Sequence, residues 1–306
     1  MTADIAMIAV DWGTSNRRAW ALDGAGHVLA EKGDGEGLLA VEAGGFARSF
    51  ADFAAPWLAA GRSVPVLMCG MVGSKMGWAE VPYIAAPADL ASLSRNLHAV
   101  PFEGDARIAI VPGVSCVHDG VPDVMRGEEC QVLAVLAERK LRDACLLLPG
   151  THSKWVQVKD GRLATFRTYM TGELYNALTS SGTLAQLMEK SEPDRDAFMK
   201  GLARARQADG GALSHALFGV RTLGLFGTLA RTGLSSYLSG LLIGTELQDA
   251  AAWSGAEAVI AVGSPKLLDN YRIAADIFGL AFEAHDNAAL LPPALFMIAR
   301  DAALVA

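Results

Sequence analysis

The sequence contains few cysteines, little charge and no long apolar run, and each shortage excludes a class of protein. The four cysteines form no C-x-x-C pair and no Cys/His spacing typical of zinc sites, so we expect buried, reduced thiols. No apolar run is long enough to cross a bilayer, and no basic segment followed by a long apolar core opens the chain. We therefore expect a soluble, cytoplasmic protein without a membrane partner.

Charge and composition exclude further classes of partner and of enzyme. Charged residues make up 19% of the 306 residues and the formal net charge is -7, which argues against nucleic acid or an anionic membrane as a partner. Hydrophobic residues make up 52%, enough to fill the cores of one large or two medium domains. No G-x-G-x-x-G motif follows the first apolar run, so a dinucleotide-dependent dehydrogenase is poorly supported.

The start of the chain has the pattern of a phosphate-binding turn. Residues 5–10 predict a buried strand, Asp11 lies where it ends, and residues 18–22 predict an antiparallel return strand. The turn between them contains small and hydroxyl residues, among them Gly13, Thr14 and Ser15. Such a turn lets a phosphate approach backbone N–H groups, and an adjacent carboxylate is suited to hold Mg²⁺. The alternative is an ordinary hairpin with an aspartate at its turn.

A second stretch repeats this pattern. Residues 144–148 predict a strand, residues 155–159 a return strand and residues 163–168 a third strand. The turn between the first two carries the candidate phosphate ligands Gly150, Thr151 and Lys154. Because the first half of the chain has the same three-strand arrangement, we expect an internal duplication with one phosphate turn in each half. His152, inside this turn, is interpreted as a loop histidine rather than a catalyst.

A glycine-rich stretch, residues 70–78, follows the strand predicted at residues 64–69. Ligands of α/β proteins bind at the carboxyl ends of strands, which favours a ligand loop here. Its candidate residues are Gly73, Ser74 and Lys75. The alternative is a flexible connection with a packed tryptophan.

Residues 113–125 predict a polar loop, and an acidic helix start follows it. Arg126 precedes Glu128 and Glu129, and acids at this point favour a helix start through the helix dipole. These two glutamates are either first-turn charges, or one of them is a carboxylate with a catalytic role. Both interpretations remain open at this point.

The second half of the chain adds a nucleoside candidate and two helices. Residues 234–252 predict a strongly apolar helix with two glycines four residues apart, and its acidic flanks favour close helix packing over a membrane dimer motif. Residues 258–262 predict a strand that ends in Gly263 and Ser264, where bare backbone can seat an adenine or ribose. Residues 288–304 predict a C-terminal helix able to reach back to the first half.

Several motifs together resemble the 2-dehydro-3-deoxygalactonokinase family of the actin/hexokinase/Hsp70 ATPase superfamily. They are D-W-G-T-S-N-R-R-A-W, G-M-V-G-S-K-M-G-W, M-R-G-E-E, P-G-T-H-S-K-W and M-T-G-E-L, in chain order. The resemblance implies two ribonuclease-H-like α/β domains with mixed sheets flanked by helices and a cleft between them. The domains would span residues 1–142 and 143–306, with the C-terminal helix packing back on the first.

The same resemblance implies a transfer of the γ-phosphate of ATP to the 6-hydroxyl of 2-dehydro-3-deoxy-D-galactonate in galactonate catabolism. Asp11 would organise Mg²⁺, and the phosphates and nucleoside would contact Gly13, Thr14, Ser15, Gly150, Thr151, Lys154, Gly263 and Ser264. Sugar-acid candidates are Arg18, Gly73, Ser74, Lys75, Arg126, Thr171 (also a candidate N-cap) and Glu173. For the substrate carboxylate we prefer Arg18 over Lys75 and Arg126, because it follows the phosphate turn on the return strand.

The general base departs from the superfamily pattern. Sugar kinases of the superfamily commonly use an aspartate near the end of the first domain, where this chain has Glu128 and Glu129. The base is therefore Glu128, Glu129 or Asp11. Two other functions stay in view: a kinase of the same fold acting on another sugar or amino sugar, and a non-catalytic ATP-dependent switch. A homodimer is one of the oligomeric states that the sequence leaves open.

Overall fold

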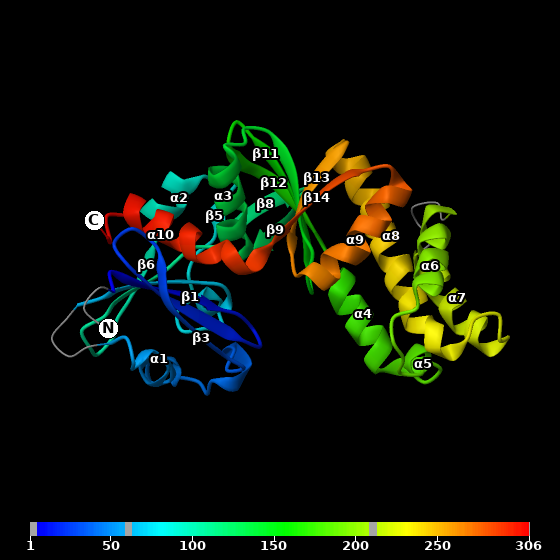
Figure 1. Cartoon of the computed structure of the whole chain (residues 1–306), viewed down its shortest axis with the longest axis horizontal. Helices are drawn as coiled ribbons and strands as arrows, with labels where there is room; N and C mark the ends of the chain where they lie inside the picture. The colour runs from blue at the N-terminus through cyan, green and yellow to red at the C-terminus, as the bar shows by residue number, and fades with distance from the viewer. Residues whose placement is uncertain (1–4, 59–62, 208–212, 306) are drawn as a thin grey trace. The chain divides into compact units, whose positions relative to one another are not determined.

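The computed structural model describes residues 5–58, 63–207 and 213–305 (Figure 1). The chain divides into two compact units. Unit 1 comprises Met1–Asp143, Val158–Thr165 and Asn287–Ala306, and unit 2 comprises Ala144–Gln157 and Phe166–Asp286. Mixed sheets flanked by helices form both units, which confirms the predicted α/β class. The domain boundary after residue 142 stays a prediction.

The sheet of unit 1 has the strand order β3-β2-β1-β4-β7-β6. Its strands are β1 (Met7–Trp12), β2 (Arg17–Leu22), β3 (Val28–Asp34), β4 (Pro65–Cys69), β6 (His98–Val100) and β7 (Arg107–Ile110). The first three are antiparallel, and β1, β4 and β7 are parallel. Nearly every side chain of β1 and β4 is buried, as expected for strands covered on both faces.

The helices that accompany this sheet within the described residues are α1 (Phe46–Ala54), α2 (Leu90–Arg95), α3 (Glu128–Arg139) and α10 (Leu291–Asp301). Phe46, Phe50 and Phe53 lie one helical turn apart on α1 and enter the core that contains Trp12. Helix α10, red in Figure 1, packs against α2, α3 and β1. Single 3-10 turns, η1 (Leu38–Ala40) and η2 (Met71–Gly73), lie in the loops of the same unit.

The polar loop predicted at residues 113–125 is wrong. This stretch forms the hairpin of β8 (Val114–His118) and β9 (Val121–Met125), which joins β5 (Ile84–Ala85) in a three-stranded sheet. Asp119 and Gly120 make the turn with φ of 51° and 82°, a conformation typical of two-residue hairpins. The strands escaped detection because the valines beside the turn are 66% exposed, so no buried face marks the segment.

The second sheet repeats the topology of the first, in the order β12-β11-β10-β13-β14. Its strands are β10 (Ala144–Leu148), β11 (Ser153–Lys159), β12 (Arg162–Tyr169), β13 (Ala258–Gly263) and β14 (Ala281–Asp286). Three strands of one meander are followed by two parallel partners, as in β3-β2-β1-β4-β7. The internal duplication predicted from the two turns is therefore present in the strand order.

The helices of unit 2 are α4 (Thr171–Ser180), α5 (Gly182–Ala185), α6 (Arg195–Gln207), α7 (Leu213–Leu225), α8 (Leu234–Ser254) and α9 (Pro265–Phe278). Short turns η3 (Arg231–Gly233) and η4 (Asn287–Ala289) precede α8 and α10. Helices α6 and α8 pack closely. A Cβ at Gly240 would lie 2.1 Å from the backbone oxygen of Phe198, so only glycine permits this approach. The predicted close packing is thus confirmed, and within the described residues no helix has the length and apolarity to cross a membrane.

Candidate active site

The first phosphate turn lies between β1 and β2 and is braced from behind by backbone. The Gly13 N–H donates to the Asn16 carbonyl (2.9 Å), and the Leu38 N–H donates to the Gly13 carbonyl (2.9 Å). A Cβ at Gly37 would lie 2.3 Å from the carbonyl carbon of Ser15, so only glycine fits there. Thr14 and Ser15 themselves remain exposed. The turn is therefore held rigidly while its hydroxyl groups face outward.

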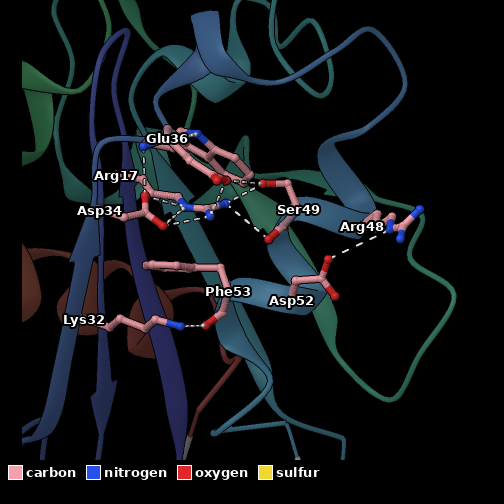
Figure 2. Close-up of polar contacts among 9 residues, drawn as sticks. Arg17, Lys32, Asp34, Glu36, Arg48, Ser49, Asp52 and Phe53 are labelled. Carbon is pink, nitrogen blue, oxygen red and sulfur yellow. Dashed lines mark hydrogen bonds and ion pairs between the residues drawn. The ribbon is translucent and has the colours of Figure 1, made fainter.

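Arg17 fixes the loop that carries Gly37 (Figure 2). Its guanidinium is buried and forms a bidentate pair with Asp34, with Nε–Oδ1 and Nη2–Oδ2 distances of 2.9 Å. It also donates to Glu36 (2.9 Å) and to the Ser49 hydroxyl (2.6 Å), and it lies 4.1 Å from the centre of the Phe53 ring. One side chain thus joins β2, the loop after β3 and helix α1 behind the turn.

We expect Arg17→Met to lower the free energy of unfolding by about 3 kcal/mol, because it removes the charge-assisted hydrogen bonds of a buried guanidinium to Asp34 and Glu36 and its bond to Ser49. Arg48→Met is the matched control, since Arg48 is 91% exposed and its nitrogen lies 3.9 Å from Asp52. That change should cost less than about 0.5 kcal/mol. Urea unfolding of both variants measures the difference, and equal losses would contradict the structural role given to Arg17.

Asp11 lies at the edge of this turn beside two glycines with positive φ. Gly70 (φ 90°) follows β4, and a Cβ there would lie 3.1 Å from Oδ1 of Asp11. Gly127 (φ 107°) packs against Gly70 in turn. Burial raises the pKa of Asp11 to about 6, with a further rise from the charge of Glu128 and a smaller lowering from Arg18. The structure thus brings the predicted acidic helix start to Asp11.

The two glutamates of that helix start have different environments. Glu128 is partly exposed, and its Oε2 accepts from the backbone N–H of Arg126 (3.0 Å). Glu129 is 1% exposed, and both its oxygens accept from the Gly127 N–H (2.9 and 2.8 Å). Burial, and then the charge of Glu128, raises the pKa of Glu129 to about 8. Glu129 is therefore an interior carboxyl whose neutral form is favoured by burial and by the charge of Glu128.

A buried acid of this kind makes stability depend on pH. The folded pKa of Glu129 lies above the unfolded value of 4.5, so its contribution is fully present below pH 4.5 and is lost as pH rises through about 8. We expect Glu129→Gln to be more stable than the parent by up to about 3 kcal/mol at pH 7, with equal stability at pH 4. Urea unfolding from pH 4 to pH 8 tests this, with exposed Glu138→Gln on the same helix as control. A parallel pH dependence in all three proteins would refute it.

Arg126 is a buried cation with incomplete hydrogen bonding. It is 8% exposed, its Nη2 donates to the Val81 carbonyl (2.7 Å), and its guanidinium lies 4.3 Å from the centre of the Tyr83 ring. Its Nε and Nη1 and the hydroxyl of Ser74 are the buried side-chain polar atoms that find no partner within the described residues. A Cβ at Gly73 would lie 2.8 Å from Nη1 of Arg126, so the absence of a side chain at Gly73 gives this nitrogen room. Buried N–H groups of a cation without acceptors are suited to an anionic ligand.

The loop after β4 is ordered rather than a flexible connection. The Trp78 N–H donates to the Val72 carbonyl (2.8 Å), and a Cβ at Gly77 would lie 2.1 Å from that oxygen. The Trp78 ring lies 6.5 Å from the Trp12 ring within the aromatic cluster of the core. Gly73 lies beside Nη1 of Arg126, Ser74 is the next residue of this loop, and Lys75 is exposed. Arg18 is also exposed, opposite Asp11 in the β1–β2 pair.

Unit 2 contains a cavity of about 730 Å³ beside the second phosphate turn. Its lining comes from the turn and from helices α4, α6, α8 and α9 and includes Gly150, Thr151, Thr171, Ser239, Lys266 and Tyr271. A Cβ at Gly172 would lie 2.4 Å from the Gly150 carbonyl, so this glycine lets α4 pack directly on the turn. The volume lies within the range of about 300–1,000 Å³ that is typical of ligand pockets.

Four other predicted residues of unit 2 lie outside the cavity lining. Gly263 is buried against Pro149, and Ser264 is the N-cap residue of α9; neither is part of the cavity lining as described. Lys154 is buried and donates to the Thr168 hydroxyl (2.8 Å). Glu173 contacts His152 through a short hydrogen bond between two half-exposed side chains.

The predicted N-cap role of Thr171 is wrong. The N-cap residue of α4 is Met170, and no side chain caps it. The Thr171 hydroxyl instead donates to Oε2 of Glu246, a buried carboxylate on α8. Sequence analysis missed Glu246 and Arg17 as site residues. A lone acid in the apolar run 238–247 was the available signal for Glu246. The sequence offers no signal that separates Arg17 from Arg18.

The repeated strand order, with a turn of small residues after the first strand of each sheet, defines the actin-like ATPase class of α/β proteins. A solved structure of component A of the (R)-2-hydroxyglutaryl-CoA dehydratase from Acidaminococcus fermentans has the same fold, with a TM-score of 0.50 at 12% identity over 98% of this chain and 99% of that one.

The chain belongs to the 2-keto-3-deoxy-galactonokinase family, whose model matches residues 11–298. A Rhizobium meliloti (strain 1021) protein named "Probable 2-dehydro-3-deoxygalactonokinase" is 37% identical over 91% of both chains. The 2-dehydro-3-deoxygalactonokinase of Escherichia coli (strain K12) is 39% identical over 78% of both. A crystal structure from Sinorhizobium meliloti, to which the same enzyme name is assigned, gives a TM-score of 0.87 at 35% identity over 96% of both chains. The family resemblance noted in the sequence is confirmed.

Proposed function

We propose that this chain is an ATP-dependent kinase that phosphorylates the 6-hydroxyl of 2-dehydro-3-deoxy-D-galactonate, a step of galactonate catabolism. The observation that carries the proposal is the family match over residues 11–298. Two relatives with this enzyme name are 37% and 39% identical to the chain over aligned segments of 282 and 241 residues. The enzyme is thus a phosphotransferase with an alcohol group as acceptor, and its need for ATP fits a cytoplasmic location.

The nucleotide is assigned to the cavity of unit 2. Gly150 and Thr151 border it, so backbone N–H groups of the turn are available to the phosphates. Lys266 adds a cation at the start of α9, where a helix N-terminus favours anions. Gly263 and Ser264 lead into the same helix and are kept as nucleoside candidates.

Asp11 is assigned to Mg²⁺ in unit 1. The residues fit this ion, because Asp11 supplies a carboxylate near the end of β1 and the turn that follows supplies the hydroxyl groups of Thr14 and Ser15. No cation lies within ion-pair distance of Asp11 in the part of the chain that the structure describes. When bound, Mg²⁺ neutralises charge on the phosphates. A nearby dication also favours the ionised form of a carboxyl whose pKa burial has raised to about 6.

Glu128 is assigned as the general base. It is the partly exposed member of the glutamate pair, and only its Oε2 takes a hydrogen bond from the described residues. The other oxygen is therefore available to accept the proton of the sugar hydroxyl. Glu129 is less suited to accept this proton, because both its oxygens are buried and accept from the Gly127 N–H.

Arg126 and Ser74, rather than Arg18, are assigned to the carboxylate of the sugar acid. The N–H groups left over in a buried guanidinium match an acidic substrate, whereas the exposed Arg18 can be neutralised by solvent ions. Gly73 lets Arg126 approach the Ser74 loop. The other sugar-acid candidates, Lys75, Thr171 and Glu173, have no comparable support.

The test is ADP release in a coupled assay with a panel of acceptors: 2-dehydro-3-deoxy-D-galactonate, its gluconate epimer, D-galactonate, D-galactose and N-acetylmannosamine. We expect the highest kcat/KM with the galactonate-derived keto acid and little ADP release without an acceptor. A preference for a neutral or amino sugar would favour the alternative kinase. Acceptor-independent hydrolysis alone would favour an ATP-dependent switch.

A further inference from the structure

Glu246 on α8 is a fully buried carboxylate surrounded by neutral donors. It is 2% exposed, and within the described residues no lysine, arginine or histidine lies within ion-pair distance of it. Oε1 accepts from the Trp155 indole N–H (2.8 Å), and Oε2 accepts from the hydroxyls of Tyr271 (2.7 Å) and Thr171. Burying an acid without a cation is costly, and an apolar side chain would serve folding alone at lower cost.

The partners of Glu246 connect the elements that border the nucleotide cavity. Thr171 is the first residue of α4, Tyr271 lies on α9, and both line the cavity. Trp155 is the third residue of β11, the strand that follows the phosphate turn. Ser153, at the start of β11, shares a 2.9 Å hydrogen bond with Tyr271. The buried network therefore connects the start of β11, the start of α4 and the middle of α9 to α8.

The hydrogen bonds of the network can form without a charge at residue 246, so variants can test hydrogen bonding and charge separately. An indole N–H can only donate, so Trp155 requires an acceptor at residue 246. The hydroxyls of Thr171 and Tyr271 can donate or accept, so they can also receive hydrogen bonds from an amide NH₂ group. Glutamine can therefore satisfy every partner of Glu246. Leucine would leave the Trp155 N–H without an acceptor.

We propose that Glu246 is a positioning residue for the nucleotide: it holds Thr171 and Tyr271 at the cavity wall and ties both to the strand that follows the phosphate turn. The inference depends on the proposed function, because it takes the cavity of unit 2 as the ATP site. Glu246 acts through its hydrogen-bond partners and does not itself line the cavity.

The test compares Glu246→Leu, Glu246→Gln and Tyr271→Phe. Tyr169→Phe is the matched control, because Tyr169 also donates to a carboxylate, Asp249 (2.6 Å), but does not line the cavity. We expect Glu246→Leu to raise the ADP Kd and the KM for ATP about 10-fold or more, since buried donors lose their acceptor. The KM for the sugar acid should change less than about 2-fold, because its assigned residues lie in unit 1. Glu246→Gln should retain the parent values.

Calorimetric ADP binding and steady-state kinetics give these numbers, and thermal unfolding reports on folding. Parent-like ADP affinity in Glu246→Leu, or equal rises in both KM values, would overturn the inference. If Glu246→Leu does not fold, Tyr271→Phe decides: it should weaken ADP binding while Tyr169→Phe does not, and equal effects would again overturn it. If the parent protein binds no ADP, both the proposed function and this inference fail. If the parent binds ADP and the variants match it, the positioning role alone fails.

Discussion

Replacing Glu128 with glutamine is expected to lower kcat about 10²- to 10⁴-fold, the usual contribution of a general base. The amide keeps the size of the side chain and can still accept from the Arg126 N–H, so the local structure should persist. It cannot take up the proton of the sugar hydroxyl. The KM for the sugar acid and the ADP Kd should change little, because the loss arises in the transition state.

Two companion variants assign the base among the three candidate carboxylates. Glu129→Gln should retain most of the turnover, because its carboxyl is interior and held by the Gly127 N–H. Asp11→Asn should instead raise the Mg²⁺ concentration needed for half-maximal rate, since a charged oxygen ligand is lost. Full turnover in Glu128→Gln would exclude Glu128 as the base. A large loss in Glu129→Gln with normal folding would transfer the role to Glu129.

Much of the fold was predictable because its signals are local. Continuous apolar runs gave the central strands, and the strand at residues 144–148 was placed with its observed bounds. A turn of small residues after a buried strand gave both phosphate turns. The hairpin of β8 and β9 failed this test, since its exposed valines provide no periodic burial.

The candidate site was predictable only where it is contiguous in sequence. Asp11 and the acidic start of α3 were found as separate motifs, and their meeting depends on Gly70 and Gly127, 57 residues apart in the chain, packing against each other. Arg17 was overlooked in favour of Arg18 because adjacent strand residues face opposite sides, and the sequence does not say which side is covered. Glu246 becomes visible as a site residue only once Trp155, Thr171 and Tyr271 converge on it.

Arg126→Met is expected to lower kcat/KM for the sugar acid about 10²-fold or more, within the range for truncating one partner of a buried charge pair. Most of the loss should lie in the KM for the acid, while the ADP Kd stays at its parent value. Arg126→Lys should restore little of the lost kcat/KM. An ammonium group cannot keep the hydrogen bond to the Val81 carbonyl and the contact with the Tyr83 ring while it also contacts a carboxylate. Ser74→Ala should show a smaller rise in the same KM.

Arg18→Met is the control that distinguishes the two arginines. Arg18 is exposed and Arg126 is 8% exposed, so loss of the exposed charge should change the KM for the acid less than about 3-fold. Thermal unfolding of Arg126→Met separates lost recognition from lost folding, because a merely structural role would lower stability without a selective rise in one KM. The assignment fails if Arg18→Met carries the large KM effect, or if folded Arg126→Met binds the sugar acid as the parent does. In the first case the substrate carboxylate lies beside the phosphate turn; in the second, the unpaired N–H groups of Arg126 have no part in substrate recognition.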